Sequence, residues 1–555
     1  MAFSVSPAVL VNEIDNTNTI GAISTSIGAL VAGNLQWGSC GTIEQVVSED
    51  DLKDRFGAPN DINYKDWFTA SNFLQYSKNL QLVRVVEDTA RNATATITSG
   101  APGPGQGQLI KNASEYSTLV LTEFFAAKYP SSLGNSLRVV GAIPDDFQSS
   151  ASTPKTFTLQ TDGATSAPIL VNSLFDESSI AADELALLVI FNDGLVDTDT
   201  VVERMIVSTT PGAKNGAGQI YYFDNYLEQY SDWLYGNYSF PDAEIFTWGI
   251  GEDFQLGGGQ NGAVAEGAEY ILGLDVIAAA TEVDISLLMT GGAPLVASNY
   301  AIDNVAGVRK DCMAFVSPAQ EDVINENNAA KMILAKDDGL VPSSSYGSMD
   351  GNYKYMYDKY ADIYRWVPFN GDIAGLCALT DNTNDPWFSP AGFNRGRIRG
   401  TVKLAMQPSK AVRDEMYKNN INPIASFPGD GVVLFGDKTL QAKSSAFQFI
   451  NVRRLFIVLE KSISTAAKYQ LFEFNDAQTQ ATFRNMVEPF LRRVKGRRGV
   501  YDYRVVADAT VNTPAIIDAG EFVAEIYIKP SRSIQVMNLH FIATKTGVAF
   551  EESAG

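Results

Sequence analysis

The feature that constrains the fold most is a change in residue pattern, from mixed helix and strand to strand-rich and back again along the chain. Residues from about 22 to 88 and from about 243 to 406 combine short apolar runs with segments whose apolar residues recur at helical spacing. Between them, residues 89 to 242 are rich in Thr, Ser, Gly and Asn and hold β-branched runs such as ATATITS and STLVLTE. A chain of 555 residues is also too long for one hydrophobic core. We therefore expect a discontinuous middle α/β domain, 22–88 with 243–406, interrupted by an inserted β-rich domain, 89–242.

Local patterns place individual elements within the two α/β stretches. Ser48, with Asp51 three residues on, is expected to start a short helix by capping it. The other elements expected are a strand at EQVVS, a helix over 64–77, a strand over 80–86, strands over 285–290 and 312–317, and helices over 297–309 and 321–335.

Residues 407–555 return to helices and strands and are expected to form a C-terminal domain. An amphipathic helix is expected within 451–472, and a second one after Asn475 as its N-cap, with a kink at Pro489. Two strands then close the chain. Their apolar faces hold Phe522, Ala524, Ile526 and Ile528 in the first strand, and Met537, Leu539, Phe541 and Ala543 in the second, over 534–543.

The N-terminal arm, residues 1–21, also alternates. Phe3 and Val5 share a face that Val9 and Val11 continue beyond Pro7, which confines such a strand to an edge. A polar, glycine-containing tether follows over 13–26. Two interpretations stay open: the strand pairs outside its own domain, or it docks on its own sheet.

Catalytic and cofactor chemistry finds little support in the residues. The one histidine, His540, lies in the last expected strand beside Leu539 and Phe541, and we interpret it as structural because no Gly-x-Ser-x-Gly elbow accompanies it. The glycine-rich runs GPGQGQ and LGGGQNG lack the Lys-Ser/Thr of a phosphate-binding loop. Cys40, Cys312 and Cys377 lie far apart, which argues against a disulfide framework or zinc site. We expect no enzyme, no cofactor and no metal.

Composition limits the partners. The chain has 42 basic and 64 acidic residues, a formal charge of −22, so most of its surface repels nucleic acid and anionic lipid. No apolar run of about eighteen residues suggests a membrane span. The first residues have no basic region followed by an apolar one, so we expect no signal peptide.

A basic cluster near the C-terminus departs from this acidic background. It comprises Arg492, Arg493, Lys495, Arg497 and Arg498, with Arg484 two turns earlier on the same expected helix. Three interpretations stay open: a solvated face that favours the helix macrodipole, a nucleic-acid site, or a surface for an acidic protein partner, which we rank slightly first.

Several long runs resemble the tail sheath proteins of contractile-tailed bacteriophages, in collinear order. The C-terminal runs are INVRRLFIVLEKSISTAAKYQLFEFND, FLRRVKGRRGVYDYRVVAD and GEFVAEIYIKPSRSI. The others include STSIGALVAGNLQWGSCGTIEQVVSEDDLKDRFGAP, NFLQYSKNLQLVRVV, AAKYPSSLGNSLRVV and KYADIYRWVPFNGDIAGLCALTDNTNDPWFSPAGFNRG. The resemblance covers most of the chain outside parts of 89–242.

The resemblance implies a multidomain α+β and α/β protein. Residues 407–555 with the arm 1–21 would form an inner α/β domain with inter-subunit strand exchange. The middle α/β domain and the outer β-rich domain would lie at larger radius. The arms would exchange strands through Phe3, Val5, Val9, Val11, Ile526, Ile528, Met537, Leu539 and Phe541. The tube-facing residues would be Arg484, Arg492, Arg493, Lys495, Arg497 and Arg498.

The resemblance further implies a virion protein, assembled in the host cytoplasm, that contracts without nucleotide when the baseplate triggers it. Its partners would be further copies of itself in hexameric rings of a helical polymer, the tail tube protein, baseplate proteins and the tail terminator, with no nucleic acid and no membrane insertion. Two alternatives remain: the sheath of a bacterial contractile injection device, and a self-assembling surface-layer or adhesin protein.

Overall fold

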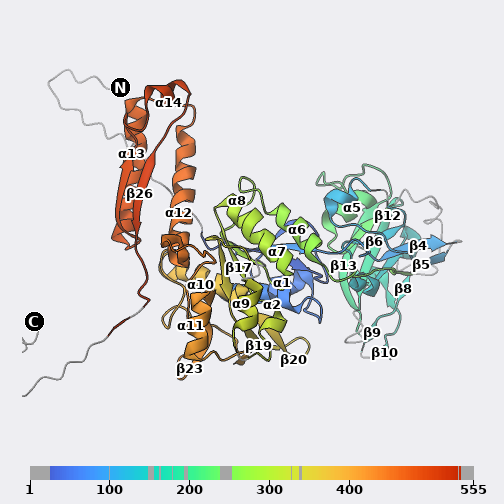
Figure 1. Cartoon of the computed structure of the whole chain (residues 1–555). Coiled ribbons are helices and arrows are strands. Elements are labelled where there is room, and N and C mark those ends of the chain that lie inside the picture. Colours follow the sequence, from blue (N-terminus) through green and yellow to red (C-terminus); the bar gives the residue numbers. More distant parts are fainter. Residues whose placement is uncertain are drawn as a thin grey trace, which may run out of the picture. The chain divides into compact units, whose positions relative to one another are not determined.

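The computed structural model describes residues 25–98, 101–119, 121–147, 155–161, 164–177, 179–192, 198–237, 253–326, 328–336, 341–535 and 537–538. This part of the chain divides into two compact units (Figure 1). The larger is Ile23–Asp385 with Pro390–Arg453, and the smaller is built on Pro386–Ser389 with Arg454–Gly555. The mixed α/β fold class expected from the sequence is confirmed.

A seven-stranded sheet forms the centre of the larger unit. Its neighbouring strands pair in parallel, except that β2 pairs antiparallel with β3. Strands of both expected α/β stretches therefore lie in one sheet. The order across the sheet is β2 (Ile43–Val46), β3 (Leu80–Val85), β1 (Gly28–Gly33), β16 (Leu287–Met289), β17 (Met313–Val316), β18 (Gly347–Asp350) and β22 (Ile421–Asn422).

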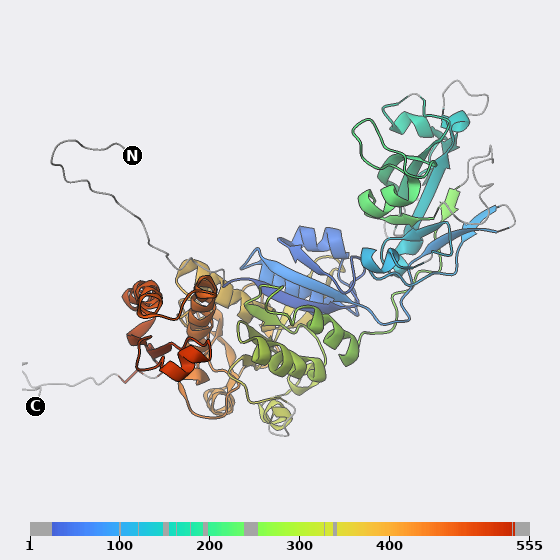
Figure 2. The same cartoon turned by 90° about the horizontal axis from the view of Figure 1, so that it is seen from above.

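Helices cover both faces of this sheet, as the near-continuous burial of its strands requires (Figure 2). On one face α6 (Gly267–Val276) lies so close that a Cβ at Gly273 would be 2.5 Å from Val31. On the other, α2 (Tyr64–Leu74) places Phe73 2.5 Å from where a Cβ of Gly28 would be. The remaining helices of this part are α1 (Glu49–Phe56), α7 (Leu295–Tyr300), a π-helical turn (Ala301–Ala306), α8 (Gly307–Arg309), α9 (Ala330–Ala335), α10 (Asn370–Thr383) and α11 (Lys410–Lys418).

Polar side chains of the helices fill the edge of the sheet where its parallel strands end. The buried carboxylate of Asp66 in α2 accepts hydrogen bonds from the amides of Gly33 and Gly292, at 2.8 and 2.5 Å. Asn370 in α10 exchanges two hydrogen bonds with the backbone of Gly291. Burial raises the pKa of Asp66.

Two further buried acids lie close by. Asp350, at the end of β18, accepts a hydrogen bond from the Ser317 hydroxyl, and burial raises its pKa to about 8. Asp372 of α10 pairs with Lys354, whose ammonium lies 2.9 and 3.0 Å from the two carboxylate oxygens. Both side chains of this pair are 0% exposed. The polar network joins segments that are far apart in sequence.

Two small antiparallel sheets complete the α/β part of the larger unit. They are β20-β19-β21 (Ile363–Pro368, Tyr353–Asp358, Lys403–Leu404) and β23-β24 (Ile424–Phe427, Gly431–Leu434). Because β22 pairs with β18, residues 407–453 group with the larger unit, whereas the sequence placed the start of the C-terminal domain at 407. The four-part domain division stays a prediction.

The helix expected over 321–335 is wrong over most of its length. A 3₁₀ turn, Gln320–Asp322, is followed by Asn325 in the left-handed conformation, φ +65°, and α9 begins only at Ala330. Asparagine adopts that conformation more readily than other non-glycine residues, so it ends the helical path here.

The inserted region is β-rich. Its two four-stranded antiparallel sheets pack around Phe124, Phe125, Phe223 and Phe254. The sheets are β13-β12-β7-β15 (Thr200–Ser208, Glu184–Phe191, Leu137–Ala142, Asp253–Gln255) and β14-β6-β4-β5 (Leu234–Gly236, Phe125–Ala127, Thr94–Thr98, Ala101–Pro104). The smaller elements are β8 (Thr156–Phe157), β9 (Gln160–Thr161), β10 (Ala164–Thr165), β11 (Ile169–Leu170), α3 (Ala113–Tyr116), α4 (Pro144–Phe147) and α5 (Phe223–Tyr230).

The smaller unit is a helical hairpin packed on a two-stranded sheet (Figure 1). Its core holds the stripe expected from the sequence, with Phe483, Val487, Leu491 and Val494 buried and Phe490 half-buried. Its elements are α12 (Ile450–Ala467), α13 (Ala477–Gly496), β25 (Val500–Val506), α14 (Pro514–Asp518) and β26 (Glu525–Pro530). Within the described residues, no helix is long and apolar enough to span a membrane.

Candidate interaction surfaces of the smaller unit

The β25–β26 sheet has two open edges. The strands pair antiparallel, with Tyr503 opposite Ile528 and Val505 opposite Ile526, and no third strand joins them among the described residues. A two-stranded sheet is marginally stable alone, and the free N–H and C=O groups of its edges are a template for added strands. The sheet is thus a candidate acceptor for strands from other chains.

The two faces of this sheet differ. Tyr503, Val505, Ile526 and Ile528 are half-buried against the helical core, so the expected alternation is confirmed at Ile526 and Ile528. The strand begins only at Glu525, so Phe522 and Ala524 of the expected apolar face lie before it. The opposite face exposes only polar and aromatic side chains. Its members are Tyr501, Asp502, Arg504, Glu525, Tyr527 and Lys529.

Most residues expected in the exchanging arms lie outside the described part of the chain. These residues are Phe3, Val5, Val9, Val11, Leu539 and Phe541. His540 also lies outside the described part. Of the terminal strand expected over 534–543, the described residues 534–535 and 537–538 form no strand in the single chain, and Met537 is exposed. Ile526 and Ile528 are described, and they lie in β26.

Helix α13 carries the basic cluster at its C-terminal end. Its N-cap is Asp476, whose side chain accepts from the Thr479 amide at 2.8 Å, so the expected cap at Asn475 is wrong by one residue. Asn475 instead donates to the carbonyl of Glu521. The helix continues through Pro489 to Gly496.

The six cations of the cluster are not equivalent. Lys495 pairs with Asp502 at 2.9 Å, and the guanidinium of Arg497 lies 6.0 Å from the ring centre of Trp387. Arg484 is half-buried. The other three cations are exposed and form no ion pair with any residue that the structure describes. These free cations are Arg492, Arg493 and Arg498.

The hairpin tip, residues 468–476 between α12 and α13, is a surface that the sequence reasoning missed. It exposes Tyr469, Leu471, Phe472 and Phe474 in one short connection. The signal was the apolar run YQLFEF at a place where a connection between helices is normally polar.

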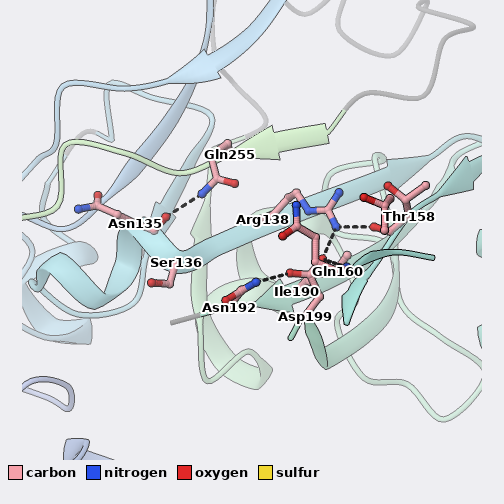
Figure 3. A pocket seen from close by; sticks show the side chains of 10 residues that line it. Asn135, Ser136, Arg138, Thr158, Gln160, Ile190, Asn192, Asp199 and Gln255 are labelled. Carbon is pink, nitrogen blue, oxygen red and sulfur yellow. Dashed lines mark hydrogen bonds and ion pairs between the residues drawn. The ribbon is translucent and has the colours of Figure 1, made fainter. Parts of the chain in front are cut away.

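A polar pocket of about 540 Å³ lies in the inserted region, and Figure 3 shows its lining. Arg138 crosses it and pairs with Asp199 and Asp253 at 3.1 and 2.9 Å. Asp199 also accepts hydrogen bonds from the Gln160 amide and the Asn192 side chain. Lys155 lies 3.8 Å from Asp253, so two cations face the two carboxylates, and the pairs tie neighbouring strands together.

Metal and thiol chemistry have no assembled site in the described part of the chain. No group of three or more His, Cys, Asp or Glu side chains is placed there to hold a metal ion. The three cysteines, Cys40, Cys312 and Cys377, are buried.

Comparison with known proteins identifies related chains. Residues 263–440 match the model of the phage tail sheath protein central domain, 442–544 that of the phage tail sheath C-terminal domain, and 29–85 that of the tail sheath protein Gp18 domain III N-terminal region. The chain is 34% identical to the tail sheath protein of Vibrio phage KVP40, over 99% of this chain and 100% of that protein. It is 32% identical to the tail sheath protein of Enterobacteria phage T4, over 99% of each.

Solved structures with the same fold are also sheath proteins. A sheath tail protein of Listeria innocua superposes with a TM-score of 0.54 at 12% identity, covering 92% of this chain and 96% of that one. The helical sheath of the anti-feeding prophage in its contracted state gives a TM-score of 0.52 at 12% identity, covering 98% and 100%.

Proposed function

The chain belongs to the phage tail sheath protein family, and from this premise we propose that it polymerises as a helical stack of hexameric rings around a tail tube and contracts when the baseplate triggers it. The family consists of structural proteins of contractile phage tails and related contractile injection systems, not of enzymes. Its members are virion components, which sets aside the surface-layer or adhesin alternative. The relatives above 30% identity are phage proteins, which favours a phage tail over a bacterial injection device.

The open edges of the β25–β26 sheet support the proposed self-association. In the proposed polymer, the N-terminal strand of one protomer and the C-terminal strand of another complete the sheet of a third. Each backbone hydrogen bond added in this way contributes about 0.5–1.5 kcal/mol. Donor segment and acceptor sheet differ, so the contact is heterologous and propagates instead of closing a dimer.

Contraction in this proposal is a change between two packings of largely rigid bodies. The segment 13–26 would absorb the change and keep the network of exchanged strands intact. Work would come from the free-energy difference between the extended and contracted states, without nucleotide. About a few kcal/mol per subunit, multiplied along a polymer, makes such a transition irreversible.

The basic end of α13 is the proposed contact with the tube. Exposed ion pairs are worth about 0–1 kcal/mol each, which suits a contact that must be released during contraction. Among the six residues expected to face the tube, the free cations Arg492, Arg493 and Arg498 have the charge available for an acidic partner. Lys495 is already paired. Baseplate proteins and a tail terminator are the further proposed partners, and assembly is proposed to take place in the host cytoplasm.

The observation that carries the proposal is the collinear similarity over 99% of the chain. Negative-stain electron microscopy of the purified chain, with and without the tube protein of the same phage, tests it. Tubes of stacked rings are expected, and their diameter will show which state forms unaided. Monodisperse particles under both conditions would contradict the proposed polymer.

A further inference from the structure

The hairpin tip presents an unusually apolar surface to solvent. Phe472 is 106% exposed and Phe474 85%, with Tyr469 at 78% and Leu471 at 64%. Exposed apolar residues gathered in this way mark a contact with another molecule more often than a bare surface. No segment among the residues that the structure describes covers these side chains.

The tip is held in place at its base. Phe472 has φ +71°, a left-handed conformation that bulky residues adopt at a cost. Asp476 caps α13 next to it, and Asn475 binds the carbonyl of Glu521. The backbone of the tip is therefore held at its C-terminal end, directly after the exposed aromatic residues.

The solvent face of the β25–β26 sheet has the complementary chemistry. Tyr501 and Tyr527 are 67% and 55% exposed, and Arg504 is paired in register with Tyr527. Arg504 is exposed and forms no ion pair with a described residue. The carboxylate of Asp508 interacts electrostatically with Arg504 and accepts a hydrogen bond from the Thr510 amide. The face thus combines two tyrosines and the free cation Arg504 with Asp502, Glu525 and Lys529. Of its two acids, Asp502 is paired with Lys495, and Glu525 accepts a hydrogen bond from the Tyr527 hydroxyl.

We propose that the hairpin tip of one copy docks on the outer face of the β25–β26 sheet of a second copy. Phe472 and Phe474 lie against the two exposed tyrosines, and Glu473, the exposed acid between them, pairs with Arg504. Aromatic rings on both sides with opposite charges between them give both packing and register.

A second copy fits better than another partner because one chain carries both halves of the contact. Tip and face are different surfaces of the same unit, so their contact is heterologous and extends a polymer, in addition to strand exchange. The inference rests on the proposed polymer and adds to it a contact through side chains on the sheet's face, distinct from backbone pairing at its edges.

A charge swap tests the contact. Glu473→Arg and Arg504→Glu should each raise the protein concentration needed for half-maximal sedimentation of polymer by about tenfold, because each brings like charges together. The double variant restores the pair and should return within about threefold of wild type. The matched control is Glu415→Arg with Lys418→Glu on the exposed side of α11, singly and together, which should assemble as wild type does.

A second pair of variants isolates the apolar part. Phe472→Ser and Phe474→Ser should lose polymer while the thermal unfolding of the monomer stays unchanged. The proposal is overturned if the single swap variants polymerise like wild type, or if the double variant is as weak as the two losses added. The latter result would assign the tip to the tube or the baseplate. A wild-type chain that never polymerises, with or without tube, would instead overturn the proposed function.

Discussion

If the basic end of α13 contacts the tail tube as proposed, reversing the charge of Arg492, Arg493 and Arg498 should weaken that contact without unfolding the chain. In the variant Arg492→Glu, Arg493→Glu and Arg498→Glu, the three proposed ion pairs with the tube, worth about 0–1 kcal/mol each, are lost and replaced by repulsion. The expected loss is up to about 3 kcal/mol per subunit, which is about 100-fold in affinity for the tube. Screening by salt should shrink the difference, since the side chains are exposed.

The structure also indicates how each charge reversal would affect the fold. Lys495 pairs with Asp502, so a glutamate at 495 would disturb β25 directly. Arg493 lies in the last turn of α13, where a negative charge opposes the helix macrodipole at a cost of about 0.3–1 kcal/mol. The neutral triple Gln variant avoids most of this cost and should show an intermediate loss of binding.

Co-sedimentation of preassembled tubes with increasing amounts of each variant, at low and high salt, measures this loss. Circular dichroism melting checks that the variants stay folded. The matched control makes the same charge change on exposed lysines of the larger unit, through Lys410→Glu, Lys418→Glu and Lys443→Glu. The reasoning fails if the triple Glu variant binds tubes as wild type does, or if the control loses as much affinity.

Three further outcomes are expected. Deletion of residues 1–15 should leave a folded, soluble chain that does not sediment as polymer, since the exchanged strand and its hydrogen bonds, about 0.5–1.5 kcal/mol each, are gone; polymers seen by electron microscopy would contradict strand exchange. Lys354→Met should lower the free energy of unfolding in urea by about 3–5 kcal/mol because Asp372 is left buried and unpaired, and adding Asp372→Asn should recover much of it; a single-variant loss below about 1 kcal/mol would refute this. Burial raises the pKa of Asp350 from 3.8 to about 8, so between these pH values the folded chain holds a proton that the unfolded chain has released. The stabilisation that this proton gives the folded chain is therefore complete below pH 3.8 and is lost as the pH rises to about 8. The difference in unfolding free energy should shift in favour of Asp350→Asn by about 1 kcal/mol per pH unit in that window, and a pH-independent difference would rule out the raised pKa.

The sequence anticipated those elements whose cause is local. Ser48 caps α1 by accepting from the Asp51 amide, and the apolar stripe of α13 is buried as its spacing indicated. The two wrong predictions, the helix over 321–335 and the cap at Asn475, have causes that the spacing of apolar residues does not show. Asn325 has a left-handed backbone conformation, which interrupts the run expected to be helical. The side chain of Asn475 binds the Glu521 carbonyl, 46 residues away, and its neighbour Asp476 is the N-cap.

Pairing at long range could not be read from the sequence. The two-residue strand β22 joins the central sheet through β18, and this draws residues 407–453 into the larger unit. A strand of two residues, such as Ile421–Asn422, is too short to show the alternation by which strands are predicted. The basic cluster was visible as composition, but its division into paired and free cations depends on Asp502 and Trp387, which only the fold brings beside it.

The edge of the central sheet bears on the proposed mechanism of contraction. Open α/β sheets bind ligands at the edge where their parallel strands end. Here Asp66 and Asn370 fill that edge with hydrogen bonds to the chain's own backbone, across segments more than 30 residues apart. These side chains tie helices α2 and α10 to the strand ends, and satisfied buried hydrogen bonds of this kind favour a rigid body. If contraction proceeds as proposed, rigidity of this kind directs the released free energy into the contacts between subunits, where it can do work, and not into deformation of the subunit itself.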